Sequence, residues 1–248
     1  MRPKKVPLNC DLVFLALVTV FSAVLSSADR PAPIRTIDWE AVPCPPEKLI
    51  IRDIDLNGDG RHEELSIQKE LANTSGPSWY PREFWDDCYR LTIRDSLNGV
   101  AYTEDFCSAY GDFKIYALNL TGGKQVDIIF ELYKNRGVGV TEKYLVVKHW
   151  DGTKLVEKAS VPASVHASKT KFGPMAYCEK RMRFRSTHSG FWQATLELRC
   201  ERTEGGRIED PTEVQPDTPA EKEFLSAKIQ KLAYDAQSDS YHLLAVKP

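Results

Sequence analysis

The feature of this 248-residue chain that most constrains its fold is an acidic run at residues 53–64, which reads DIDLNGDGRHEE. Oxygen-bearing side chains recur at alternate positions, and Gly58 and Gly60 lie where a loop would turn sharply. Calcium takes roughly six to eight oxygen ligands, and a tight loop can supply them from alternate side chains. Five carboxylates this close together would repel one another, and the neighbouring basic side chains offset only part of their charge. The run therefore predicts a calcium loop.

Two ligand registers fit this run. Counted from Asp53, it matches the EF-hand pattern, with Gly58 at the turn and Glu64 as the closing bidentate ligand. A shorter register uses five ligands, which are Asp55, Asn57, Asp59, the carbonyl oxygen of Arg61, and Glu63. An EF-hand needs an amphipathic helix on each side, whereas residues 48–52 and 65–68 are short segments rich in β-branched residues. We therefore expect a strand, a loop and a strand.

Residues 55–63 resemble the calcium loop of FG-GAP and VCBS repeats, which are integrin-like propeller modules. The resemblance covers residues 48–70 and implies a β-hairpin that holds calcium for structural reasons. A weaker echo follows at residues 119–130, with a glycine turn, an acid and an apolar strand. That echo lacks most of the acidic ligands, so we expect no second ion there. Repeats of about 60 residues would fit three or four times, too few for a seven-bladed propeller.

The N-terminus has the pattern of a secretory signal peptide. Basic residues near Met1 precede an apolar core at residues 12–25 and small residues at 26–28. The apolar core is shorter than the roughly 20 residues of a membrane span, and no later stretch qualifies. An uncleaved anchor is the alternative. We expect a signal peptide at 1–28, an N-terminal extension at 29–47, and a single β-rich domain at 48–248 with a long loop at 201–221, in a secreted or periplasmic protein.

Five cysteines follow the predicted signal peptide, and an exported protein oxidises the pairs that it can form. They are Cys44, Cys88, Cys107, Cys178 and Cys200. The pair Cys88 and Cys107 brackets a turn at residues 96–99, and the pair Cys178 and Cys200 brackets a turn at residues 187–190. Folding about the second turn places Met182 opposite Leu196, on one apolar face. These patterns predict two cross-strand disulfides and leave Cys44 free or differently paired.

Hairpin patterns recur along the rest of the chain. Residues 144–150 and 153–156 flank an Asp-Gly turn, and residues 232–234 and 241–244 flank a polar turn. A short helix is predicted at residues 220–231. The fold class that follows is all-β with minor α, built from antiparallel hairpins in a sandwich or a small propeller-like arrangement.

The sequence contains no recognisable catalytic arrangement. Its histidines lack metal-binding spacing, and neither a nucleophile elbow nor a phosphate loop is present. Four aromatic residues form a loop cluster that either caps the core or binds a protein or polysaccharide, namely Trp79, Tyr80, Phe84 and Trp85. A formal net charge of −2 without a basic block favours no nucleic-acid partner.

These observations predict an exported, non-catalytic, calcium-binding β domain that acts as a binding protein. One form of this hypothesis is an inhibitor or immunity protein against a cell-wall hydrolase. A hydrolase with an unrecognised site is the alternative from another class. The oligomeric state is left open.

Overall fold

The computed structural model describes residues 31–39, 48–75, 86–95, 99–109, 111–135, 141–167, 169–170, 176–202, 206–210, 213–216 and 218–246. Within these stretches nearly every element is a strand that pairs antiparallel with its neighbours, and one short helix lies near the C-terminal end. The predicted all-β class with a minor helix is confirmed.

The described strands form three main sheets. The first sheet is a meander of β2 (Lys48–Ile54), β3 (Glu63–Ser75), β4 (Asp86–Asp95) and β5 (Gly99–Ala109). The second sheet has the order β1 (Arg35–Asp38), β6 (Phe113–Leu118), β7 (Asp127–Asn135), β8 (Thr141–Trp150) and β9 (Leu155–Pro162). The third sheet has the order β10 (Ser164–Ala167), β12 (Ala176–Ser186), β13 (Trp192–Arg202), β16 (Ile229–Asp235) and β17 (Ser240–Ala245), with β14 (Arg207–Ile208) beside β13. A small fourth pair joins β11 (Lys169–Thr170) to β15 (Val214–Gln215).

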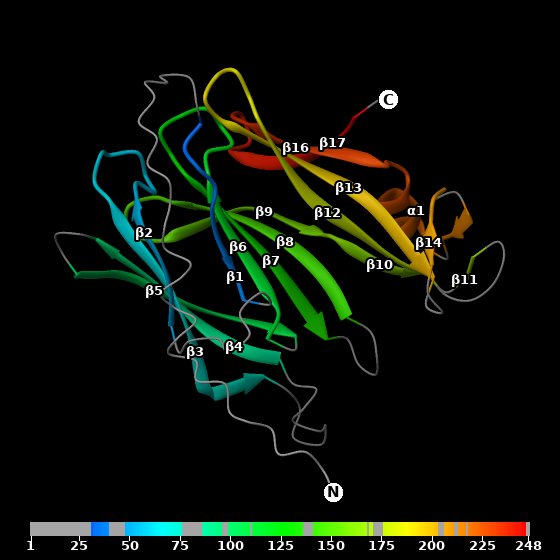
Figure 1. The fold of residues 1–248 in the computed structure, drawn as a ribbon, viewed down its shortest axis with the longest axis horizontal. Coiled ribbons are helices and arrows are strands. Elements are labelled where there is room, and N and C mark those ends of the chain that lie inside the picture. The colour runs from blue at the N-terminus through cyan, green and yellow to red at the C-terminus, as the bar shows by residue number, and fades with distance from the viewer. Residues whose placement is uncertain are drawn as a thin grey trace, which may run out of the picture.

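The second sheet lies between the other two, so both of its faces are buried. In β7, Ile128 belongs to the same core cluster as Leu91 of the first sheet. The next residue, Ile129, belongs to the cluster that includes Leu196 of the third sheet. Because successive side chains of a strand point to opposite faces, this apolar run fills two cores at once. Figure 1 shows the three sheets as successive layers from β2–β5 through β6–β9 to β12–β17.

Both predicted disulfides are confirmed. Cys88 of β4 lies directly opposite Cys107 of β5 and is bonded to it. Cys178 of β12 is likewise opposite Cys200 of β13 and bonded to it. The predicted register of the second hairpin is also correct, because Met182 pairs with Leu196. The hairpins β8–β9 and β16–β17 form around the expected turns as well.

The C-terminal helix is shorter than the sequence predicted. The structure has α1 at Pro219–Leu225, where the prediction was 220–231. The side chain of Thr218 caps the start by accepting from the Glu221 amide, and Ser226 caps the end. Residues Ile229–Lys231 pair with β13 instead, because that strand offers partners for their backbone N–H and C=O groups. The predicted helix was therefore wrong over its second half.

Two other segments contain more structure than their sequences suggested. The predicted N-terminal extension contributes β1, which pairs with β6 at the edge of the second sheet. Trp39 is buried in the core cluster that contains Leu91 and Ile128. The predicted long loop at 201–221 contains β14, β15 and the start of α1. The acidic run, in contrast, is flanked by strands β2 and β3, as expected, and the helices of the EF-hand alternative are not formed.

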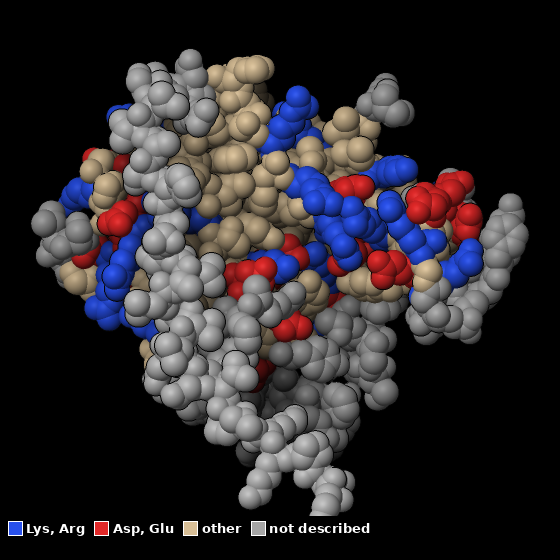
Figure 2. Space-filling view, in the orientation of Figure 1, with Lys and Arg blue, Asp and Glu red and all other residues tan. Residues whose placement is uncertain are grey.

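The outer face of the third sheet carries charges of both signs. Arg183 and Arg199 lie 3.5 and 3.6 Å from the carboxylate of Glu197, and Arg181 pairs with Glu179. Figure 2 shows lysine and arginine side chains interspersed with acidic ones over this part of the surface. Because the signs alternate, the described residues of this face produce no strong field of one sign.

Candidate functional site

The acidic loop, defined here as residues 55–63, connects β2 to β3 and folds back on its own amides. The Asp55 carboxylate accepts hydrogen bonds from the Gly58 and Gly60 N–H groups at 2.7 and 2.9 Å. The Asn57 side-chain oxygen accepts from the Asp59 N–H at 3.1 Å, and the Asp59 carboxylate accepts from the Arg61 N–H at 2.8 Å. Short side chains that bond to the backbone two or three residues later stabilise such turns. The loop is thus organised by its own side chains.

Glu63 closes the loop from the first position of β3. It is 5% exposed, and its carboxylate accepts a hydrogen bond from the Leu56 N–H at 2.8 Å. Burial raises the pKa of Glu63, the bond from Leu56 opposes that rise, and the charges of Asp59, Asp55 and Asp95 add to it. The carboxylates therefore raise the free energy of a charged Glu63, and a cation near them would lower it.

Asp95 is a member of this acidic group that the sequence analysis missed. It ends β4, and the β3–β4 ladder places it opposite Glu63. The guanidinium of Arg61 lies 4.0 Å from the Asp95 carboxylate and 3.1 Å from the Asp59 carboxylate. A single acid at a strand end gives no signal in the sequence, because only the strand register brings it to the loop.

The two predicted ligands that only the EF-hand register uses, Asp53 and Glu64, make none of the loop hydrogen bonds described above. Glu64 accepts a hydrogen bond from Arg52 at 3.1 Å and, as the strand neighbour of Glu63, points to the opposite face. Asp53 lies in β2 with a φ of 55° and is exposed. The hydrogen bonds of the loop thus link Asp55, Asn57 and Asp59, while Glu64 is directed elsewhere.

A second loop, residues 119–127, joins β6 to β7 and has the same hydrogen-bond framework. The Gly122 N–H donates to the Asn119 side chain at 2.8 Å, as the Gly58 N–H does to Asp55. The Leu120 N–H donates to the Asp127 carboxylate at 2.9 Å, as in the closure of the acidic loop. Gly122 also has the left-handed φ of 79° that its counterpart shows at 78°. The weak sequence echo therefore corresponds to a repeated local structure.

The two loops differ in charge. Asn119 stands where the first loop has Asp55, and Gly123 stands where it has Asp59. Since the second loop makes the two shared hydrogen bonds with neutral residues at these positions, the shared bonds do not need the carboxylates of Asp55 and Asp59. Each carboxylate oxygen has two lone pairs, so one amide hydrogen bond leaves it able to accept from a cation. In this respect the acidic loop fits a hard divalent cation.

The closing carboxylate of the second loop is held by protein groups. Asp127 is fully buried, and it contacts His149 Nε2 and accepts from the Tyr241 hydroxyl at 2.7 Å. Burial, followed by the charge of Asp127, raises the pKa of Tyr241. Because Tyr241 belongs to β17, this cluster links the second sheet to the third.

The two loops are packed against each other. The Val126 N–H donates to the Leu56 carbonyl oxygen at 3.1 Å. A Cβ atom on Gly58 would lie 2.6 Å from the Cβ of Lys124, so only glycine fits this contact. The acidic loop is therefore part of the seam between the first and second sheets.

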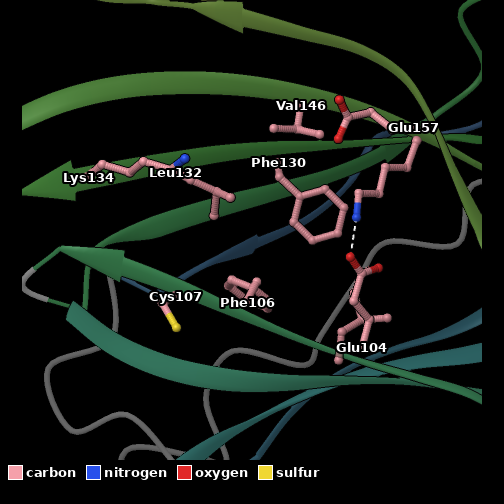
Figure 3. A pocket seen from close by; sticks show the side chains of 10 residues that line it. Glu104, Phe106, Cys107, Phe130, Leu132, Lys134, Val146 and Glu157 are labelled. Atoms are coloured by element: carbon pink, nitrogen blue, oxygen red, sulfur yellow. Dashed lines mark hydrogen bonds and ion pairs between the residues drawn. The ribbon is translucent and has the colours of Figure 1, made fainter. Parts of the chain in front are cut away.

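A groove lies beside this seam, between β5 and the facing side of the second sheet, with a cavity volume of about 230 Å³. Figure 3 shows its labelled side chains converging from β5 on one side and from β7, β8 and β9 on the other. Its apolar lining is Leu91, Phe106, Cys107, Phe130, Leu132 and Val146. Charged side chains stand among them, namely Glu104, Lys134, Lys148 and Glu157, with Lys148 paired to Glu104.

One cluster in the C-terminal hairpin contains the side chains of a hydrolytic triad but in a different geometry. The hydroxyls of Ser238 and Ser240 lie 3.1 and 3.0 Å from His242 Nε2, and the Asp235 carboxylate lies 4.0 Å from the same nitrogen. A working triad places the hydroxyl at one ring nitrogen and the carboxylate at the other. Here Asp235 does not orient the ring for proton transfer from serine.

Several predicted residues lie outside the described part of the chain. They are the signal peptide at 1–28, Cys44, and the aromatic residues Trp79, Tyr80, Phe84 and Trp85. Over the described residues, no His, Cys, Asp or Glu side chains converge in a group of three or more that would hold a metal as they stand. Among the same residues no helix has the length and apolarity needed to cross a membrane.

Comparison of the chain with protein-family models, curated proteins and solved structures gave no match. The resemblance to FG-GAP and VCBS loops therefore depends on the sequence of residues 48–70 alone.

Proposed function

We propose that this protein is an exported β domain that binds calcium in the acidic loop and acts by binding a partner. The observation that carries the proposal is the matched pair of loops at 55–63 and 119–127. Both have the amide hydrogen bonds made by Gly58 or Gly122 and by Leu56 or Leu120, and only the first has carboxylates at the two positions where the second has Asn119 and Gly123. When two loops share hydrogen bonds and only one has additional carboxylates, that loop is the one expected to bind a cation.

The ligands of the ion are those of the shorter register. Asp55, Asn57 and Asp59 would supply side-chain oxygens from the turn, Arg61 its carbonyl oxygen, and Glu63 the closing carboxylate. The bound ion supplies positive charge and a cross-link between the two ends of the loop. Glu64 is not a ligand in this proposal, because it pairs with Arg52 on the other face of β3.

The groove beside β5 is the surface that we assign to partner binding. An apolar floor with a few charged groups is typical of sites that combine affinity with specificity. The segment that carries Trp79, Tyr80, Phe84 and Trp85 joins β3 to β4, and Asp86 at the start of β4 pairs with Ala109 at the end of β5. The predicted aromatic anchors therefore precede, along the sequence, the strand that pairs with β5.

The calcium site is tested by thermal unfolding with excess calcium and with chelator. We expect calcium to bind with a Kd on the order of 10⁻⁴ to 10⁻³ M and to raise the Tm. Asp59→Ala should abolish most of that rise, because it removes a central ligand. Asp105→Ala is the matched control, since Asp105 is an exposed aspartate that pairs with Arg90 on the first sheet. A wild-type Tm that is the same with calcium and with chelator would refute the calcium proposal.

The binding proposal is tested against the hydrolase alternative with a cell-wall substrate. The mature protein is incubated with peptidoglycan alone and with peptidoglycan plus a lysozyme-type enzyme. Inhibition of the added enzyme supports the inhibitor form of the proposal. Release of soluble fragments by the protein alone would instead establish a hydrolase.

A further inference from the structure

Both oxygens of the Asp59 carboxylate have partners in the structure, and Oδ2 has two of them. Its Oδ1 accepts from the Arg61 N–H at 2.8 Å. Its Oδ2 accepts from the Asn57 side-chain amide at 3.1 Å and lies 3.1 Å from Arg61 Nη2. The guanidinium therefore lies against one of the two oxygens that Asp59 could offer to an ion.

Asp95 offers the same guanidinium a second carboxylate. Arg61 Nη1 lies 4.0 Å from Asp95 Oδ2, at the outer limit of an ion pair. Asp95 comes from the end of β4, so its position is set by the sheet and does not depend on the loop conformation. The Arg61 side chain is 52% exposed, and it can therefore move between the two acids at little steric cost.

We propose that Arg61 is a tethered cation that competes with calcium for Asp59, and that Asp95 receives Arg61 when the ion binds. This inference rests on the calcium proposal above. In the metal-free loop, Arg61 neutralises Asp59. When calcium binds Asp59, the guanidinium is released and shifts to Asp95, so no positive charge is left facing the ion. The competition makes the affinity lower than the ligand set alone would give.

The test is calcium titration by isothermal calorimetry of the full mature protein and four variants. Exposed ion pairs have modest energies, so Arg61→Ala should tighten the Kd by about two- to fivefold. Arg61→Ala keeps the backbone carbonyl that serves as a ligand. Arg52→Ala is the matched control, because Arg52 pairs with Glu64 on the same hairpin and its loss changes the net charge equally. It should leave the Kd within twofold of wild type.

A double-mutant cycle distinguishes two effects of Asp95: accepting the Arg61 guanidinium and attracting calcium through its own charge. Asp95→Asn in the wild-type background should weaken calcium binding about two- to fivefold, because Arg61 then remains with Asp59. In the Arg61→Ala background the same change should have a clearly smaller effect, because only the direct attraction between Asp95 and the ion is then lost. If Asp95→Asn changes the calcium Kd equally in both backgrounds, Asp95 acts only through its own charge. The proposed movement of Arg61 from Asp59 to Asp95 would then be wrong.

The outcomes distinguish this inference from the calcium proposal. If wild type and all variants give no binding heat, the calcium proposal fails and the exchange fails with it. If wild type binds calcium but Arg61→Ala binds no tighter, or Arg52→Ala tightens binding equally, the calcium proposal stands and the exchange is overturned. Circular dichroism of each variant checks that its fold is unchanged.

Discussion

Lys180 illustrates at the residue scale how burial and charge oppose each other. Its side chain lies in the core face of β12 and is 3% exposed. The ammonium group contacts the amide oxygen of Gln230 and lies 4.2 Å from the centre of the Phe224 ring. Burial lowers the pKa of Lys180 to about 8, and the charge of Glu223 opposes that shift only in part. The Phe224 ring and the Gln230 oxygen both favour the charged ammonium group, and burial opposes it.

We predict that this lysine makes the unfolding free energy depend on pH. The unfolded chain binds a proton at Lys180 up to about pH 10.4, whereas the folded protein releases it near pH 8. Stability should therefore rise with pH between these values. Lys180→Met should remove most of that rise and stabilise the protein at pH 7 by about 1–3 kcal/mol. Urea unfolding at pH 7 and pH 9.5 measures both effects, below the range in which buried tyrosines ionise.

The exposed Lys154 provides the control for this measurement. Lys154→Met should leave both the stability at pH 7 and the slope with pH close to wild type. A Lys180→Met variant with the wild-type slope would show that the ammonium group is hydrated in solution, contrary to its burial here.

At the scale of elements, the acidic loop and the second loop depend on left-handed glycines. Gly58 and Gly60 have φ values of 78° and 87°. A Cβ on Gly58 would meet Lys124 of the second loop, whereas a Cβ on Gly60 meets no atom within 4 Å. The two positions therefore separate backbone strain from contact between the loops.

We predict that Gly58→Ala is more destabilising than Gly60→Ala. Each substitution introduces left-handed strain of about 1–2 kcal/mol. Gly58→Ala should add about 1–3 kcal/mol, because the loops must move apart to admit the methyl group. Urea unfolding of both variants in chelator measures the difference. Equal destabilisation would mean that the loops are not packed together in solution.

At the scale of the whole molecule, a buried polar cluster joins the second and third sheets. Asp127 is contacted by His149 from β8, by Tyr241 from β17 and by the Leu120 amide. Removing one donor from such a cluster destabilises the fold, because a buried carboxylate oxygen is then left without that hydrogen bond.

We predict that Tyr241→Phe destabilises the protein by about 1–3 kcal/mol. Tyr234→Phe is the matched control in the same hairpin, because its hydroxyl donates at 2.6 Å to the exposed carboxylate of Asp239. That variant should change stability by less than about 0.5 kcal/mol. Hydrogen exchange should show that Tyr241→Phe exposes amides of β16 and β17 first. A uniform loss of protection over all three sheets would contradict a role in joining the third sheet to the second.

The amino-acid sequence by itself determined the features that depend on neighbours along the chain. Period-two alternation and turn residues predicted the hairpins, and matched cysteine spacing predicted both disulfides. The strand-loop-strand form of the acidic loop followed from its β-branched flanks. These patterns are readable because each reflects interactions within about twenty residues.

Only the tertiary structure decided which distant groups meet. The β3–β4 register brings Asp95 to the acidic loop, and packing of the sheets brings Tyr241 to Asp127 and β5 to the groove. Ile229 was predicted to be helical but pairs with β13, because pairing with that strand outweighs a weak local helical preference. A single side chain at the end of a strand gives no periodic pattern in the sequence. Its partner depends on strand register and on how the sheets pack, so the sequence alone does not predict it.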